Sequence, residues 1–325
     1  FSLVGLSQTF FINYLWLLIL EQIKIFLMKF GHVDQLNDVV FSFPNVDSKT
    51  KEILSSYKSK KKPLFYFGAP GWSDVKFKGL LYPPKTPQKN FLNEYAKQFN
   101  SIEVNATRYG TPKISTIDNW INQVNGNFKF SMKLPQVITH RKDINDRESK
   151  EKINQFLSAV FHLGTFSGIC FAVMANYFKS NQFHNLERFI SSWPIDVPIA
   201  VELRDKSWFE KNTLNEVQDL FSRYGVIPVI TDTPGRRDVL HLNVTNDQLF
   251  VRYVGDFSHP SDKFRINGWV EKIGELTNLG IKKIWFYVHQ PGENRERILD
   301  FFNNMIPYIN TKLSLEIPLL KNYKI

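Results

Sequence analysis

Residues 199–209 have the composition of a reactive site, because an apolar run ends there in two opposite charges and a tryptophan. The run reads Ile-Ala-Val-Glu-Leu-Arg-Asp-Lys-Ser-Trp-Phe, so Glu202 and Arg204 are two positions apart and Trp208 follows them. Side chains alternate between the two faces of a strand, which places Glu202 and Arg204 on the same face. An isolated buried charge is costly. The pair therefore indicates a built site, with a purely structural ion network as the alternative.

Other apolar runs of the chain also end in residues of the kinds that transfer protons or bind anions. Carboxylates and histidines can act as general acids and bases, and the predicted catalytic residues are Glu103, Glu202, His140 and Asp232. Cations, amides and aromatic rings can hold a substrate, and the predicted substrate-binding residues are Trp72, Asn105, Tyr109, Lys133, Arg204, Trp208 and Arg252. Each has a structural alternative as a strand-end hydrogen-bonding, ion-pairing or core residue.

No motif in the sequence identifies a cofactor. His140 and His289, together with the three carboxylates, have the ligand chemistry for a divalent metal. The sequence contains no HxH or HExxH spacing, however, so no metal ligand is assigned and a divalent metal stays an open alternative. The glycines between residues 68 and 79 do not match the spacing of either nucleotide-binding loop.

The runs that end in these residues alternate with amphipathic stretches. Strands are predicted at 64–68, 101–105, 128–133, 168–174, 198–203, 226–231, 249–254 and 283–288. Helices are predicted at 88–99, 113–124, 147–162, 182–192, 213–224, 267–279 and 295–309, and a loop at 232–246. The alternation predicts an α/β fold with parallel strands, namely a TIM-like (β/α)8 barrel with an N-terminal extension. An open, doubly wound sheet is the alternative. In a barrel, the carboxyl ends of the strands meet at one mouth.

The composition changes along the chain and divides it into four segments. Residues 1–27 are strongly apolar, lack the basic start and cleavage site of a signal peptide, and precede the first methionine, Met28. We interpret them as translated upstream sequence, with Met28 as the natural start and a membrane anchor as the alternative. Residues 28–63 are predicted as an arm with one short helix at 48–57, capped by Ser48. Residues 64–310 are predicted as the barrel domain and 311–325 as a C-terminal tail.

Charge and cysteine content bear on partners and compartment. The net charge of +10 favours an anionic small molecule or nucleic acid as partner, through the long-range field of the protein. An AT-rich coding sequence, which enriches lysine, is the alternative explanation. The single cysteine, Cys170, excludes a disulfide within the chain and a cysteine-based zinc site, and it fits a reducing, cytoplasmic compartment. No membrane partner is expected if Met28 is the start.

The strand-end stretches also carry a resemblance to a known family. The matching stretches are 68–73, 99–109, 130–133, 201–208 and 251–255, and through them the chain from about residue 65 to about residue 308 resembles the domain of unknown function 72, or YecE-like, family. The resemblance implies a TIM-like barrel but no activity. The chain departs from the family pattern at Arg108, where an aromatic residue is usual, and at 173–175, where the family has Gln-x-Pro.

Three functions remain open at this point. The first is a hydrolase acting on a phosphorylated or nucleic-acid-like substrate. In it, Lys133, Arg204 and Arg252 hold the anion, Glu103 or Glu202 is the general base, and His140 is the acid or a ligand. The second is a glycoside hydrolase that uses the two glutamates as its carboxylate pair. The third is a barrel that binds a ligand without chemistry.

Overall fold

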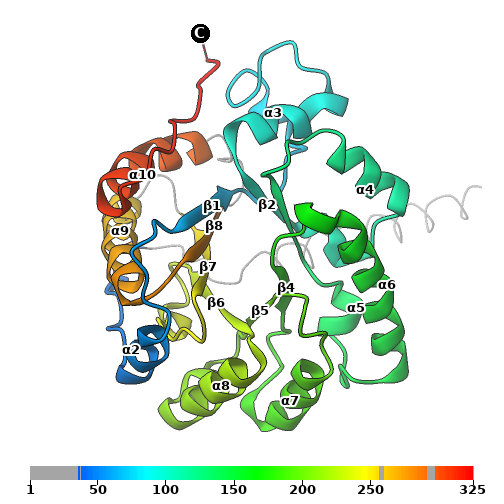
Figure 1. Cartoon of the computed structure of the whole chain (residues 1–325), viewed down its shortest axis with the longest axis vertical. Helices are drawn as coiled ribbons and strands as arrows, with labels where there is room; N and C mark the ends of the chain where they lie inside the picture. The colour runs from blue at the N-terminus through cyan, green and yellow to red at the C-terminus, as the bar shows by residue number, and fades with distance from the viewer. Residues whose placement is uncertain (1–35, 37, 256–259, 291–296, 325) are drawn as a thin grey trace, which may run out of the picture.

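The strands of the protein lie side by side around a common centre and helices surround them (Figure 1). The structure is a computed structural model that describes residues 36, 38–255, 260–290 and 297–324. The eight strands are β1 (Leu64–Gly68), β2 (Ser101–Val104), β3 (Lys129–Met132), β4 (Cys170–Val173), β5 (Ile199–Glu202), β6 (Ile227–Asp232), β7 (Gln248–Val254) and β8 (Lys283–His289). All pair in parallel, in the order β1-β8-β7-β6-β5-β4 for six of them and β2-β3 for the other two.

The helices follow the strands in alternation and lie outside the ring of strands (Figure 1). They are α3 (Phe91–Gln98), α4 (Ile114–Ile121), α5 (Gln136–Thr139), α6 (Arg147–Leu163), α7 (Phe183–Ser191), α8 (Lys211–Tyr224), α9 (Ser261–Leu279) and α10 (Ile298–Leu313), with α2 (Ser48–Ser55) before the first strand. The predicted α/β fold with parallel strands is confirmed. Within the described residues, no helix is long and apolar enough to cross a membrane. The predictions for residues 1–27 and for a start at Met28 lie outside the described residues.

A side chain bridges the first gap in the ring, between β1 and β2. Asn100 accepts a hydrogen bond from the Phe67 backbone N–H at 2.9 Å and donates one to the Phe65 carbonyl at 2.8 Å. One backbone bond, from Glu103 N–H to the Ala69 carbonyl at 3.2 Å, adds to it. The Asn100 amide thus makes hydrogen bonds to the β1 backbone in place of the strand pairing that the short β2 does not make.

Backbone bonds bridge the second gap, between β3 and β4. Gly168 N–H donates to the Phe130 carbonyl at 2.9 Å, and Leu134 N–H donates to the Phe171 carbonyl at 2.8 Å. A β-carbon at Gly168 would lie 2.7 Å from the Ser131 hydroxyl oxygen, so the close approach requires glycine. With both gaps bridged, the eight strands form a continuous ring, as the TIM-like prediction requires.

The segment between β6 and β7 contains no α-helix, only the short 3-10 helix η7 (Arg237–Val239), as the predicted loop at 232–246 implies. The vacant place in the outer layer is occupied by α2 (Figure 1). The Thr50 hydroxyl of α2 accepts from Gln218 Nε2 at 2.9 Å and from the Val244 backbone N–H at 3.2 Å. Leu54 of α2 is fully buried. The predicted arm is therefore packed into the barrel shell.

The ends of three elements differ from the predictions. The N-cap of α2 is Asp47, whose carboxylate accepts from the Thr50 backbone N–H at 2.7 Å, so the predicted cap at Ser48 is wrong. Ser48 is instead the first helical residue. Helix α9 begins at Ser261, six residues before the predicted start at 267, and α10 continues to Leu313, past the predicted end of the barrel at 310.

Two hydrophobic clusters hold the layers together. The smaller fills the inside of the ring and is formed by Ile169, Phe171, Val173, Ala200, Ile227, Val229, Phe250, Trp285 and Tyr287. The larger lies between the outer faces of the strands and the helices. The barrel is therefore a packed core rather than a pore, and a layer of charged side chains lies above it, at the carboxyl ends of the strands.

Candidate active site at the mouth of the barrel

Arg252 of β7 is the centre of an ion-pair network that joins four strands. Its Nε and Nη2 donate to the two carboxylate oxygens of Glu103 at 3.0 and 2.8 Å, and its Nη1 donates to Glu202. Arg204 Nε donates to the other oxygen of Glu202 at 2.6 Å. His289 Nε2 lies 2.9 Å from Glu103 Oε2. The network therefore brings together the carboxyl ends of β2, β5, β7 and β8.

The two-residue period of the strands explains why these side chains meet. His289 is two residues after Tyr287, which belongs to the cluster inside the ring. Glu103 is two residues after Ser101, whose hydroxyl oxygen lies 2.6 Å from that of Tyr287. Glu202 is two residues after Ala200, another member of that cluster. The charged residues thus form the layer directly above the apolar filling of the barrel.

Both glutamates are ionised at neutral pH. Burial alone would raise the pKa of Glu103, but the charges of Arg252 and His289 outweigh burial and hold it well below its usual range. Burial opposes ionisation of Glu202 in the same way, and the charges of Arg204 and Arg252 lower the pKa of its carboxyl to about 2. A proton donor at neutral pH therefore has to come from another group.

Lys133 is that group. It is two residues after Ser131, whose hydroxyl accepts from Tyr287 inside the ring, so its side chain points to the mouth, where it is 7% exposed. Burial and then the charges of Arg252 and Arg204 lower the pKa of Lys133 to about 7. Within the described residues, no acceptor lies within hydrogen-bond or ion-pair distance of its ammonium group.

Three further side chains complete the rim of the mouth. Asn105 donates from Nδ2 to Glu103 Oε1 at 2.7 Å. Thr231 of β6 lies beside Arg252 in the strand register, and its hydroxyl is buried with no hydrogen-bond partner in the described part of the chain. Val173 of β4 belongs to the cluster inside the ring, so β4 contributes an apolar side chain to the mouth. The Lys133 ammonium and the Thr231 hydroxyl are thus two buried polar groups of the mouth without a hydrogen-bond partner among the described residues.

His140 follows β3 and lies beside the network rather than in it. Its Nδ1 is 2.9 Å from the Thr139 hydroxyl, and its backbone carbonyl accepts from the Tyr177 hydroxyl at 2.6 Å. Burial and the charges of Arg204, Lys133 and Arg108 lower the pKa of His140 to about 4. The imidazole is therefore neutral at pH 7, which suits a proton acceptor better than the acid role considered for it.

Asp232 does not join the other carboxylates. It is the last residue of β6, one position beyond Thr231, and its side chain lies on the opposite, helix-facing side of the strand. There it accepts from Trp269 Nε1 at 2.7 Å and from Arg265 Nε at 3.2 Å, both on α9, and also pairs with Arg237. The expected convergence of Asp232 with Glu103 and Glu202 is wrong, because strand alternation turns it outward.

The predicted aromatic residues have three different positions. Trp208 is fully buried, stacks on Phe178 and donates from Nε1 to the Phe178 carbonyl at 2.6 Å, so it is part of the core. Trp72 is half-buried and packs edge-on against Trp120. Tyr109 is 82% exposed, and Arg108 lies over its ring. Trp208 is therefore too enclosed to stack on a ligand, whereas Tyr109 is accessible.

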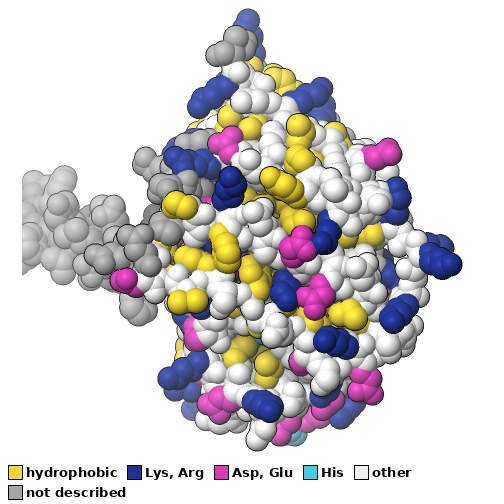
Figure 2. All heavy atoms as spheres, turned by 90° about the vertical axis from the view of Figure 1, so that its left-hand side faces the viewer, with side chains coloured by type: hydrophobic (Ala, Val, Ile, Leu, Met, Phe, Trp, Pro, Cys, Tyr) yellow, Lys and Arg dark blue, Asp and Glu magenta, His cyan; other side chains and the backbone are white. Residues whose placement is uncertain are grey.

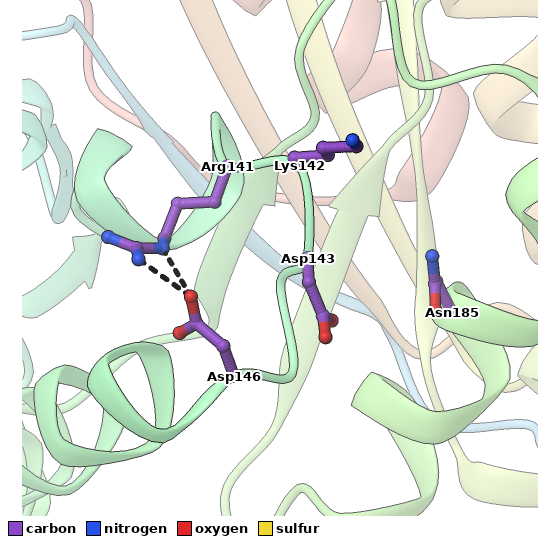
Figure 3. Close-up of a pocket in the computed structure, with 5 residues that line it drawn as sticks. All are labelled: Arg141, Lys142, Asp143, Asp146 and Asn185. Carbon is purple, nitrogen blue, oxygen red and sulfur yellow. Dashed lines mark hydrogen bonds and ion pairs between the residues drawn. The ribbon is translucent and has the colours of Figure 1, made fainter.

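A groove runs beside the mouth, between the loop after β3 and the start of α7. It consists of two hollows of about 540 and 520 Å³ that share Lys142 and Asn185. Figure 3 shows Arg141 turned toward Asp146 on one side of the first hollow and Asn185 facing it from α7. Tyr177, which bonds to His140, lines the second hollow. The groove gives an extended ligand room next to the mouth.

The described residues contain no group of three or more His, Cys, Asp or Glu side chains that could hold a metal. In the mouth, the guanidinium of Arg252 occupies the space between Glu103 and Glu202 and bonds to both carboxylates. Because a cation already lies there, the Arg252 network does not fit a second, divalent cation.

Sequence reasoning gave no role to two residues of the mouth. His289 was considered only for a metal, yet it contacts Glu103 and lies 3.3 Å from Arg252 Nη2. Thr231 resembled an ordinary β-branched strand residue. Strand alternation could have placed both at the mouth. His289 is two residues after Tyr287 and Thr231 is two residues after Val229, and both earlier residues face the inside of the ring.

The ring of parallel strands and the charged layer at their carboxyl ends define a TIM-like barrel with a site at its mouth. A family model described as "Protein of unknown function DUF72" matches residues 66–305. The chain belongs to this family, which confirms the resemblance seen in the sequence. The UPF0759 protein YecE of Escherichia coli K12 is 26% identical over 234 residues, which are 65% of this chain and 82% of that protein.

Other similar proteins agree with this assignment. The UPF0759 protein YunF of Bacillus subtilis 168 is 24% identical over 176 residues, covering 53% of this chain and 61% of that protein. The crystal structure of a DUF72 family protein from Enterococcus faecalis V583 matches with a TM-score of 0.60 at 19% identity, over 78% of this chain and 99% of that one. A DUF72 family protein from Thermotoga maritima MSB8 matches with a TM-score of 0.55 at 22% identity, over 70% and 92%. The two structures show the fold.

Proposed function

We propose that the protein is a hydrolase that binds a small phosphorylated substrate at the barrel mouth and cleaves its phosphate ester. The observation that carries this proposal is the Lys133 ammonium, buried at the mouth and without an acceptor among the described residues. A buried cation without a partner is costly unless an anion compensates it. A phosphate group supplies that charge and several acceptor oxygens.

The charges of the mouth favour an anion over a neutral ligand. Glu103 and Glu202 are matched by Arg252 and Arg204, with which they form the ion pairs described above. Protonated Lys133 is then a surplus positive charge. On the face shown in Figure 2, by contrast, basic and acidic side chains are mixed across the surface. The unpaired charge of buried Lys133 therefore favours an anion at the mouth.

The same lysine provides proton transfer. In its neutral form, Lys133 takes a proton from a water molecule as the water oxygen attacks phosphorus. The bond between phosphorus and the ester oxygen breaks, and Lys133 returns the proton to the leaving oxygen. Arg204 is placed to balance charge on the phosphoryl oxygens. A group with a pKa near the working pH is the most effective acid–base catalyst, and the pKa of Lys133, about 7, meets that condition.

The glycoside hydrolase alternative is less well supported. Such enzymes need one carboxylic acid that stays protonated near neutral pH, which requires a raised pKa. The pKa of Glu202 is lowered to about 2 and that of Glu103 is held well below its usual range, so neither carboxyl carries a proton to donate. Both carboxylates are also engaged by Arg252.

Phosphate release from a panel of phosphomonoesters, nucleotides and short oligonucleotides tests the proposal. The variant is Lys133→Met, and the matched control is Lys211→Met, which replaces an exposed lysine at the start of α8 that lines neither hollow of the groove. We expect the wild type and the control to release phosphate from at least one small ester, and Lys133→Met to be about 10²- to 10⁴-fold slower. The rate should rise with pH through about 7 as Lys133 loses its proton.

Other outcomes of the same assay decide between the alternatives. Stabilisation of the fold by a phosphate ester without phosphate release would overturn the hydrolase and favour a ligand-binding barrel. Activity only on oligonucleotides, with binding that falls steeply with salt, would replace the small substrate by nucleic acid. Equal rates for the wild type and Lys133→Met would remove Lys133 from the mechanism.

A further inference from the structure

Lys133 has the environment of an amine that reacts with carbonyl groups. A lysine becomes nucleophilic when it is desolvated or lies close to another cation, because both effects favour the neutral amine. Lys133 is buried at the end of β3, and the charges of Arg252 and Arg204 act on it from β7 and β5. The charges that act against deprotonation, Glu202 and Glu103, are both engaged in ion pairs.

The amine is also free to move toward a ligand. In the described part of the chain, nothing accepts a hydrogen bond from the Lys133 side chain, whereas its backbone is fixed. The Lys133 N–H donates to the Val104 carbonyl at 3.3 Å, and the Lys133 carbonyl accepts from the Thr107 hydroxyl at 2.7 Å. The backbone is thus anchored to the neighbouring strand end, while the amine at the end of its side chain remains available.

We propose that the Lys133 amine forms an imine with the carbonyl group of a small anionic aldehyde or ketone bound at the mouth. This inference rests on the proposed function only in taking the mouth as the site of an anionic substrate. It adds a substrate class, compounds that carry both a carbonyl group and a phosphate or carboxylate group. It does not require the phosphate ester to be cleaved.

The reaction balances without any oxidant or reductant. The lone pair of the Lys133 nitrogen forms a bond to the carbonyl carbon, and the carbonyl π electrons move to oxygen. The resulting alkoxide lies where Arg204 can stabilise its charge. Proton transfer from nitrogen to oxygen gives the carbinolamine. Loss of one water molecule, which removes the oxygen and two protons, leaves the carbon–nitrogen double bond.

Other lysines of the described chain lack one or more of these conditions. Lys129 donates to the Thr165 carbonyl at the opposite end of the barrel, so its amine is engaged. Lys97 and Lys272 form ion pairs with Glu94 and Glu275. Lys211, at the start of α8, is exposed and lines neither hollow of the groove, which makes it the suitable control for simple accessibility.

Reductive trapping with glyoxylate, a small anionic aldehyde, tests the inference on the full chain. Sodium borohydride reduces the imine to a stable secondary amine, and peptide mapping locates the adduct by mass. We expect a single carboxymethyl adduct on the peptide that contains Lys133, formed at pH 7 at least about tenfold faster than on any exposed lysine, because about half of the Lys133 amine is neutral there. Acetaldehyde, which has no anionic group, should label it more slowly.

Two lysine variants and a second measurement, phosphate release, make the trapping result interpretable. Lys133→Arg should abolish the adduct, and Lys211→Arg should leave it unchanged. Adducts spread evenly over exposed lysines of the wild type would overturn the inference, and this result does not depend on any variant folding. Phosphate release is measured on the same samples. Phosphate release without an adduct on Lys133 would refute the imine and leave the hydrolase proposal standing. An adduct on Lys133 without phosphate release would support the imine and refute the hydrolase proposal.

Discussion

The substitution Arg252→Met removes the one cation that Glu103 and Glu202 share. The methionine keeps an unbranched side chain over the ring of Phe171, on which the guanidinium now lies at 5.5 Å. Two hydrogen bonds to Glu103 and one to Glu202 are lost. The two buried carboxylates then keep their contacts with Arg204, His289 and Asn105 and the nearby charge of Lys133, but no arginine joins them.

The expected loss of stability follows from these contacts. Removing one partner of a buried ion pair destabilises a protein by about 3–5 kcal/mol, because it leaves a buried charge uncompensated. Arg204 still pairs with Glu202, so we expect a loss of about 3–4 kcal/mol at pH 7. This corresponds to a decrease in melting temperature of roughly 6–12 °C at about 2–3 °C per kcal/mol.

The loss should also depend on pH, with a sign that the pKa shifts determine. The pKa of Glu202 is lowered from 4.5 to about 2 by folding, so its ionised form stabilises the wild type above pH 4.5. This contribution is lost as the pH falls toward 2. In Arg252→Met the pKa values of both carboxyls rise, so they are neutralised earlier. The difference in stability between the wild type and the variant should therefore shrink between pH 4.5 and pH 2.

Urea unfolding at several pH values measures both effects. The control Arg147→Met replaces an arginine whose side chain is 93% exposed, and it should change stability by less than about 0.5 kcal/mol. Adding Glu103→Gln to Arg252→Met should restore part of the loss, because residue 103 then carries no buried charge without its arginine, while Arg204 keeps its pair with Glu202. A loss below about 1 kcal/mol at pH 7, or one that is constant between pH 7 and pH 2, would refute the reasoning.

Three further predictions concern the mouth, the gap between β1 and β2, and the arm. Glu202→Gln should make stability less dependent on pH between 4.5 and 2, because the Glu202 carboxyl alone should cost the wild type about 3 kcal/mol over that range, on acid titration monitored by circular dichroism. Asn100→Ala should destabilise the fold by about 2–4 kcal/mol in urea and speed hydrogen exchange at the Phe67 N–H, which loses its acceptor. Exchange there as slow as in the wild type would contradict the role of the amide as a bridge. Asp47→Ala removes the cap of α2 and should cost about 1 kcal/mol in urea, whereas the exposed Asp38→Ala should cost nothing measurable.

Most of the fold was predictable from the sequence, because a parallel strand that is covered on both faces is a continuous apolar run with clear ends. Every observed strand overlaps a predicted one, since Gly, Pro and polar residues bound each run. The place of α2 did not follow, because its partners, such as Val244, are almost two hundred residues away. No local pattern reports such a contact.

The candidate site was predictable to the extent that strand period decides which way a side chain points. Glu103 and Glu202 meet as that period requires, and Arg252 joins them. Asp232 was grouped with them because it ends a strand. It directly follows Thr231, however, so strand alternation places its side chain on the opposite face. Trp208 could not be placed, because nothing in the sequence shows that Phe178 covers its ring.

The position of α2 has a consequence for how the chain folds. Helix α2, the first described helix, packs in the outer layer against residues that come much later in the chain, such as Gln218 and Val244. Closing so long a loop is entropically unfavourable, and contacts of large sequence separation slow folding. Docking of α2 therefore has to follow assembly of β6 and β7. The early segment therefore ties the start of the described chain to α8 and to the segment between β6 and β7.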